Sequence, residues 1–172
     1  MKKLSTRLTA VTASIVVVLI ASVLFFIGRS GPIGPIPGGA LKGVIGTPPS
    51  DWAFAATAEL IQLETLGADQ EPHSVNIWFA VVGGRLYVPT SLVRGTEEPG
   101  DRTWVKNATT NPLVRIRIDG KLYPGMMSRL TESTLLDTVK KEIIKKYVTE
   151  PDARSANAWI FEIKDPTDGK NS

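Results

Sequence analysis

The sequence predicts an α+β protein whose antiparallel strands close into a barrel. At least five segments alternate apolar and polar residues with the two-residue period of a half-buried strand, and one amphipathic helix precedes the last of them. No two strands are separated by a connection long enough for a parallel βαβ unit, so antiparallel pairing is expected. A barrel closes its own edges, which favours this arrangement over an open sheet.

The clearest element is a β-hairpin over residues 74–90. Two apolar runs, SVNIWFAVV and RLYVPT, flank Gly83-Gly84, a dipeptide that accepts the positive φ angles of a two-residue turn. The resulting register sets Phe79 opposite Val88 and turns one apolar face toward the core. That face consists of Val75, Ile77, Phe79, Val81, Leu86 and Val88. The opposite face is mixed in character and suits a flat ligand or a second layer of protein.

Four further elements are predicted before and after the hairpin. An alternating run over 59–65 predicts a strand before it, and Asp101 or Thr103 can cap a short helix after it. Residues 113–118 (LVRIRI) predict the next strand, which Asp119-Gly120 turns back into another. A strict two-residue turn there would conflict with the apolar pattern, so we expect a longer turn or a bulge, and a second irregularity at the following Pro-Gly pair.

The C-terminal part predicts a helix and a closing strand. Apolar residues over 131–148 follow one helical face, and four lysines occupy the other face, which is either solvated or in contact with anionic lipid. Residues 158–163 (AWIFEI) alternate as the last strand, and the polar tail 166–172 is expected to be disordered.

The N-terminal part predicts a membrane anchor. Residues 8–28 carry no charge, and as a helix they would span about 31 Å, close to the bilayer hydrocarbon thickness of about 30 Å. A cleaved signal peptide is the alternative, although the run is longer than a usual h-region and no small-x-small site follows. The basic tip 1–7 outweighs the positive charge that follows, which predicts a cytoplasmic N-terminus and an extracytoplasmic domain. The Pro- and Gly-rich residues 29–50 predict an extended spacer.

The composition excludes several functions. The chain has no cysteine and a single histidine, His73, so thiol chemistry and a multi-histidine metal site are excluded and no metal cofactor is expected. From Asp51 onward there are fifteen basic and seventeen acidic residues, a net charge of −2, which argues against a nucleic-acid partner. No nucleophile motif is present and His73 has no identifiable catalytic partner, so no catalytic residue is assigned.

Three segments resemble a known family. GGRLYVPT (83–90), RTWVKN (102–107) and NPLVRIRIDG (111–120) are similar to the split β-barrel superfamily of pyridoxamine-phosphate-oxidase-like proteins and deazaflavin-dependent nitroreductases. The resemblance covers roughly residues 51–164 and implies an antiparallel split β-barrel domain over 51–165. In that family the barrel commonly forms a homodimer and binds FMN or a deazaflavin.

The resemblance also implies a cofactor-binding site. Hydroxyl and basic residues of the family hold the cofactor phosphate, and the matching residues here are Thr90, Ser91, Arg102, Thr103 and Lys106. The chain departs from the family in its first loop, where 67–71 is acidic although deazaflavin-dependent members usually carry a Gly-Arg-Lys-Ser-Gly-like sequence. A domain outside the membrane would also be separated from cytoplasmic reduced cofactor.

Two functions therefore stay open. The first is a membrane-anchored oxidoreductase-like protein in which FMN or a deazaflavin performs hydride transfer. The second is a non-catalytic, membrane-tethered binding module that has lost the cofactor. It would use Trp78, Tyr87 and Trp104 for a small apolar ligand or a protein partner. The three matching segments favour the first function, and the acidic loop favours the second.

Overall fold

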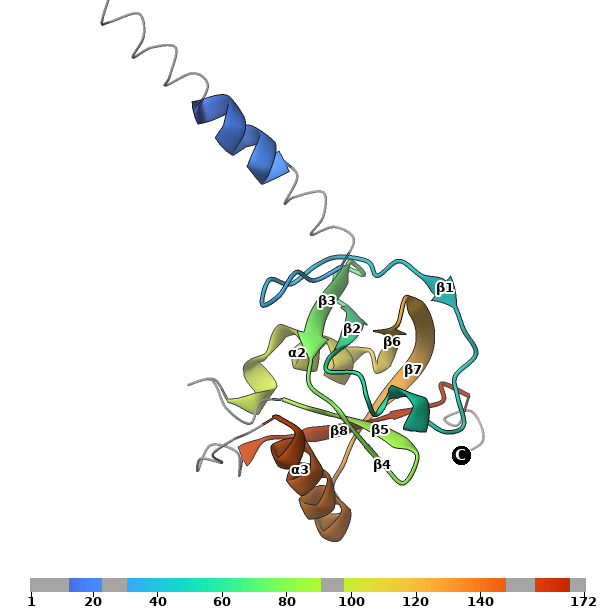
Figure 1. Ribbon diagram of the computed structural model, residues 1–172. Coiled ribbons are helices and arrows are strands. Elements are labelled where there is room, and N and C mark those ends of the chain that lie inside the picture. Colours follow the sequence, from blue (N-terminus) through green and yellow to red (C-terminus); the bar gives the residue numbers. More distant parts are fainter. Residues whose placement is uncertain (1–12, 23–30, 91–97, 148–156, 168–172) are drawn as a thin grey trace, which may run out of the picture.

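The structure, a computed structural model, describes residues 13–22, 31–90, 98–147 and 157–167 (Figure 1). Within these ranges eight strands form one sheet in the order β3-β2-β6-β7-β8-β5-β4, and β1 pairs with the first residues of β7. The strands are β1 (Val44–Ile45), β2 (Ile61–Leu66), β3 (Pro72–Ile77), β4 (Ala80–Val82), β5 (Arg85–Pro89), β6 (Leu113–Ile118), β7 (Lys121–Arg129) and β8 (Ile160–Lys164). The helices of the domain are η1 (Ala53–Ala55), η2 (Pro99–Asp101), α2 (Thr103–Thr110) and α3 (Ser133–Tyr147). Every pair is antiparallel except β1 with β7, so the predicted antiparallel α+β class is confirmed.

The two ends of the sheet are consecutive in the chain. β3 and β4 lie at opposite ends of the hydrogen-bonded order, yet only Trp78 and Phe79 separate them. The sheet therefore curls so that its two end strands come together. The two-residue connection joins them, and no ladder of backbone hydrogen bonds pairs β3 with β4. The predicted pairing of Phe79 with Val88 is therefore wrong. The β4–β5 ladder ends at Ala80 opposite Tyr87, because the chain before Ala80 pairs with β2 instead of β5.

Two apolar layers pack against the sheet. The predicted inward face of the hairpin is confirmed, since Ile77, Phe79, Leu86 and Val88 are buried in the main core together with residues of α2. On the opposite face α3 forms a second layer, which confirms the predicted amphipathic helix. Its contacts bring together Ala80, Tyr87, Val139, Ile143, Ala158 and Ile160.

The turn between β6 and β7 is tighter than predicted. Asp119 and Gly120 form a strict two-residue turn with φ angles of 48° and 77°, and Ile118 pairs with Lys121. β7 also continues from Lys121 to Arg129 without interruption. The predicted irregularities are wrong because β7 is covered on both faces near the turn, where consecutive residues Leu122 and Tyr123 are buried.

Residues 31–46, which the sequence assigns to a spacer, lie against the outside of the barrel, and we name them the strap. Gly38 forms an antiparallel bridge with Ser74, and β1 adds to β7 in parallel. Leu41 of the strap is buried, and its backbone N–H donates to the carboxylate of Glu64. Pro and Gly limit regular structure in the strap to the two residues of β1, and contacts with the barrel hold the strap in place.

The predicted transmembrane helix over 8–28 requires correction. The structure describes residues 13–22 of that range, and these residues are helical. Across the described ranges of the chain, no helix has both the length and the apolar character needed to cross a membrane. This finding contradicts the predicted single-pass, extracytoplasmic localisation.

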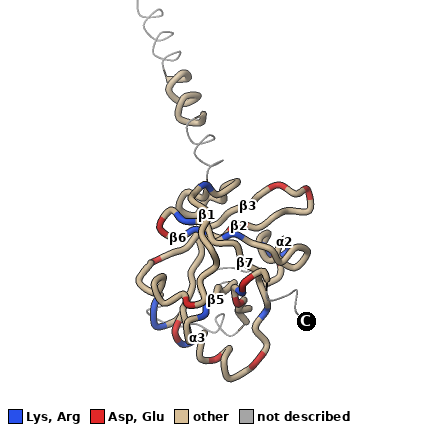
Figure 2. The backbone as a smooth tube through the Cα atoms, turned by 90° about the vertical axis from the view of Figure 1, so that its right-hand side faces the viewer, with Lys and Arg blue, Asp and Glu red and all other residues tan. Residues whose placement is uncertain are grey.

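Charges of both signs are distributed over the barrel (Figure 2). One buried pair stands out, because Glu64 of β2 is 3% exposed and accepts two hydrogen bonds of 2.7 Å from the guanidinium of Arg115 on β6. The two residues are directly opposite in the β2–β6 ladder. This pair therefore joins two strands and, through Leu41, the strap.

Candidate functional site

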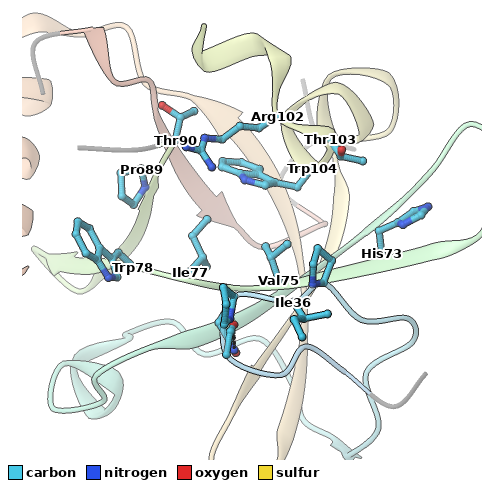
Figure 3. Close-up of a pocket in the computed structure, with 14 residues that line it drawn as sticks. Ile36, His73, Val75, Ile77, Trp78, Pro89, Thr90, Arg102, Thr103 and Trp104 are labelled. Atoms are coloured by element: carbon cyan, nitrogen blue, oxygen red, sulfur yellow. Dashed lines mark hydrogen bonds between the residues drawn. The ribbon is translucent and has the colours of Figure 1, made fainter. Parts of the chain in front are cut away.

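A cavity of about 690 Å³ lies beside β3, between the strap and α2 (Figure 3). Four segments line it: the strap, β3 with the following Trp78, the end of β5, and the start of α2. The lining residues are Gly34, Pro35, Ile36, Pro37, His73, Val75, Asn76, Ile77, Trp78, Pro89, Thr90, Arg102, Thr103 and Trp104. The volume falls within the range of about 300–1,000 Å³ that is typical of small-molecule sites.

β3 contributes the free edge of the sheet. Ser74 uses this edge to exchange backbone hydrogen bonds of 2.8 and 2.9 Å with Gly38 of the strap. Because an antiparallel ladder alternates, the backbone groups of Asn76 face the same edge, beside the cavity. The Asn76 side chain donates to the carbonyl oxygen of Gly34 at 2.9 Å and so holds the strap at this edge.

The start of α2 contributes a positively polarised end. Arg102 is the N-cap residue, no side chain caps the helix, and the first turn contains no acidic residue. The first backbone N–H groups of a helix attract anions. Figure 3 shows the Arg102 side chain reaching across Trp104 toward Thr90.

Thr90 is held firmly at the end of β5. It is 5% exposed, its backbone N–H donates to the carbonyl of Trp159 at 2.9 Å, and its hydroxyl accepts from the Trp159 N–H at 2.9 Å. A threonine hydroxyl that accepts one hydrogen bond can still donate its own proton. Thr90 can therefore offer a donor to a ligand in the cavity.

The structure brings together three of the five predicted site residues. Thr90, Arg102 and Thr103 line the cavity. Lys106 does not, because it is exposed on α2 with its Nζ 3.4 Å from a carboxylate oxygen of Asp101. Ser91 lies outside the described residues.

An aromatic pair fixes the wall formed by Trp78. The indole of Trp78 stacks on the ring of Tyr147 from α3, with centroids 4.8 Å apart and an angle of 3° between the planes. The Tyr147 hydroxyl lies 2.8 Å from the carbonyl oxygen of Glu59 and 3.1 Å from that of Phe79. Burial raises the pKa of Tyr147 to about 12, so the hydroxyl stays protonated as a donor at neutral pH. The sequence identified Tyr147 only as part of the apolar helix face.

His73 borders the cavity, but its ring is directed toward the turn between β2 and β3. A Cβ added at Gly67 would lie 3.2 Å from Nε2 of His73. The same turn carries Asp69, whose carboxylate accepts from the Glu71 N–H at 3.1 Å. The turn toward which His73 is directed is therefore acidic, although Asp69 and Glu71 do not line the cavity. Among the described residues no group of three or more His, Cys, Asp or Glu side chains could hold a metal ion.

Comparison with known proteins shows the fold class. No family model and no curated protein matches the chain. A conserved hypothetical protein from Mycobacterium tuberculosis aligns with a TM-score of 0.52 at 18% identity, covering 66% of this chain and 76% of that one. HutZ, a heme storage protein from Vibrio cholerae, aligns with a TM-score of 0.50 at 16% identity, covering 65% and 84%. A structure described as a domain-swapped dimer gives 0.50 at 16% identity, covering 62% and 81%.

At these identities the likeness concerns the fold alone. The chain is an antiparallel α+β protein, and its structural neighbours have split-barrel folds. The fold and the cavity together thus define a split-barrel-like domain with a cavity beside β3, the end strand of its sheet.

Proposed function

We propose that the chain binds FMN or a deazaflavin in the cavity beside β3 and acts as an oxidoreductase-like protein. The observation that carries this proposal is that Thr90, Arg102 and Thr103 all line one cavity, whose other walls are aromatic and apolar. When bound, the ring system supplies hydride transfer, while the protein supplies binding and orientation.

Different residues of the cavity suit different parts of such a ligand. The guanidinium of Arg102 and the N–H groups at the start of α2 would hold a phosphate, and the hydroxyls of Thr90 and Thr103 would add hydrogen bonds. The flat rings of Trp78 and Trp104 would contact the isoalloxazine or deazaflavin. The acidic turn near His73 would repel an anionic tail, so the anionic group belongs beside Arg102.

A non-catalytic binding module is the second candidate. Of the described residues that line the cavity, only His73 and Arg102 have ionisable side chains, and this set provides no pair for proton transfer. HutZ is described as a heme storage protein, so heme is a further ligand to consider for this cavity. A heme iron needs an axial ligand from the protein. The single histidine of this chain is directed at the β2–β3 turn, which disfavours heme here.

We also propose that the chain forms a homodimer. The support is the likeness to a structure described as a domain-swapped dimer, together with the family resemblance of the three segments. Analytical ultracentrifugation of the full chain tests this, and a monomer at concentrations of tens of micromolar would contradict it.

The decisive experiment is an optical spectrum of the purified full chain, followed by titration with FMN and with riboflavin. We expect flavin absorbance or a rise in melting temperature on adding FMN. Arg102→Ala should weaken FMN binding about tenfold or more and leave riboflavin binding nearly unchanged, because riboflavin has no phosphate.

Lys106→Ala serves as the matched comparison. Lys106 is one helical turn from Arg102 but pairs with Asp101 outside the cavity, so we expect less than about a threefold effect on FMN binding. If the native protein has no flavin absorbance, and neither FMN nor a deazaflavin stabilises it, the flavin proposal is wrong and the binding module remains.

A further inference from the structure

The strap begins with a closed loop of unusual sequence, GPIGPIPG, over residues 31–38. Ile33 and Ile36 exchange backbone hydrogen bonds of 3.0 and 2.9 Å, and Gly34 between them has a φ of +53°. The backbones at the two ends of the loop touch, because a Cβ added at Gly38 would lie 2.1 Å from the carbonyl carbon of Gly31. Three prolines fix φ along the loop, so its shape is set before any ligand arrives.

The loop is also fixed in position against β3. Asn76 holds the carbonyl of Gly34, and Ser74 bridges Gly38 through its backbone. The hydroxyl of Ser74, which is fully buried, donates to the carbonyl of Gly39 at 2.7 Å. Loop 31–38 is therefore attached at both its tip and its end to the strand that borders the cavity.

This loop supplies apolar surface to the cavity. Pro35, Ile36 and Pro37 line it, and Figure 3 shows Ile36 beside Val75 of β3. Ile36 is 57% exposed although the loop around it is rigidly held. A preformed apolar surface at the lip of a cavity gains affinity from a ligand that covers it, because little conformational entropy is lost on binding.

We propose that loop 31–38 is a binding wall that contacts the flat aromatic body of the ligand, while Arg102 recognises its anionic group. The flavin identity of that ligand rests on the proposed function. The two roles, with the loop contacting the aromatic rings and Arg102 contacting the anionic group, apply to any flat aromatic anion. It assigns a binding role to a segment that precedes the predicted domain.

The test measures dissociation constants of the full chain for riboflavin, FMN and 1-anilinonaphthalene-8-sulfonate, which is an aromatic anion unrelated to flavins. Ile36→Ser should weaken all the probes that wild type binds by a similar factor of about fivefold, since each loses the same apolar contact. Ile36→Leu should restore affinity to within about twofold of wild type. Ile45→Ser is the matched control, because Ile45 is another exposed isoleucine of the strap, 76% exposed, on β1 outside the cavity.

A second variant displaces the loop itself. Gly38→Ala forces a methyl group into the backbone of Gly31 and should lower affinity more than Ile36→Ser does, with an unchanged far-UV circular dichroism spectrum.

The possible results separate the two proposals. Unchanged affinities in Ile36→Ser, or an equal loss in Ile45→Ser, would overturn the role of the loop. If the sulfonate binds in an Ile36-dependent way but neither flavin binds, and a deazaflavin titrated in the same way does not bind either, the flavin proposal fails and the loop proposal stands. If wild type binds neither the three probes nor the deazaflavin, both proposals are overturned.

Discussion

The strap and α3 both cover the outside of the barrel, but they are held by different interactions. α3 buries Val139 and Ile143 completely against an apolar face of the sheet. The strap buries one large side chain, Leu41, and is otherwise attached through its backbone, which bonds to the backbone of β3 and to the side chains of Glu64, Ser74 and Asn76. The same barrel thus fixes one segment by apolar burial and the other by polar anchoring.

This difference determines what each segment can do. The apolar layer under α3 stabilises the barrel and positions Tyr147 behind Trp78. The strap leaves its own apolar residues, including Ile36, exposed beside the cavity. A segment anchored through its backbone keeps its side chains available for a ligand. Loss of α3 packing should therefore affect stability most, whereas loss of strap anchoring should affect the site.

The largest expected effect is on the α3 side. Ile143→Ala removes a fully buried side chain and should lower the free energy of unfolding by about 3 kcal/mol, because it removes apolar contacts and leaves a cavity. Urea unfolding followed by circular dichroism measures this change. Lys141→Ala, on the exposed face of the same helix, should stay within about 0.5 kcal/mol of wild type. A small effect of Ile143→Ala would mean that α3 is not the stabilising layer.

The next effect concerns the polar anchor of the strap. Glu64→Gln keeps the shape of the side chain but leaves the Arg115 guanidinium without its carboxylate. Because the Arg115 side chain is 40% exposed and can partly hydrate, we expect a loss of about 2 kcal/mol, below the usual cost of breaking a buried pair. Hydrogen exchange at the Leu41 N–H should accelerate as well, since that group donates to Glu64.

Glu162→Gln is the control for the strap anchor. Glu162 also pairs across strands, but its partner Arg85 lies 3.4 Å away with a side chain that is 64% exposed. Its loss should cost less than about 1 kcal/mol. Equal effects of the two substitutions would show that the buried carboxylate has no special role in holding the strap.

The contrast also explains how much of the fold the sequence could predict. Strands β6 and β8 and helices α2 and α3 follow from apolar periodicity, which records burial on one face. The strap has no such periodicity, because hydrogen bonds from its backbone to the barrel hold it. The break between β3 and β4 was missed for a related reason: Trp78 and Phe79 continue the apolar alternation although their backbone leaves one partner strand for another.

The candidate site was predictable only where residue types carry chemical information. Thr90, Arg102 and Thr103 were identified through a resemblance of segments, and the structure places them around one cavity. The contribution of Ile36 has no signal in the sequence, because an isoleucine between prolines reads as part of a linker. The position of Lys106 in the sequence matched a phosphate-binding residue of the family, but on α2 its side chain pairs with Asp101. Whether a side chain lines the cavity depends on distances between segments that are far apart in the sequence. A single sequence does not contain these distances.

The smallest expected effect links α3 to the cavity. Tyr147→Phe preserves the ring that stacks on Trp78 but removes the hydrogen bonds of the hydroxyl to the carbonyls of Glu59 and Phe79, so we expect a loss of about 1 kcal/mol at neutral pH. Burial raises the pKa of Tyr147 from 10.0 to about 12 in the folded protein. A raised pKa gives stability that is present below the unfolded value and lost as pH rises through the folded value.

The advantage of wild type over Tyr147→Phe should therefore shrink as pH increases from 10.0 toward about 12. Urea unfolding of both proteins across this range measures it, and the difference between them cancels the titration of lysines that they share. Burial lowers the pKa of Lys146, which makes this subtraction necessary. A difference that stays constant with pH would show that the hydroxyl is not the buried donor behind Trp78. In that case stacking alone would fix the aromatic wall, and α3 would act on the cavity only through apolar packing.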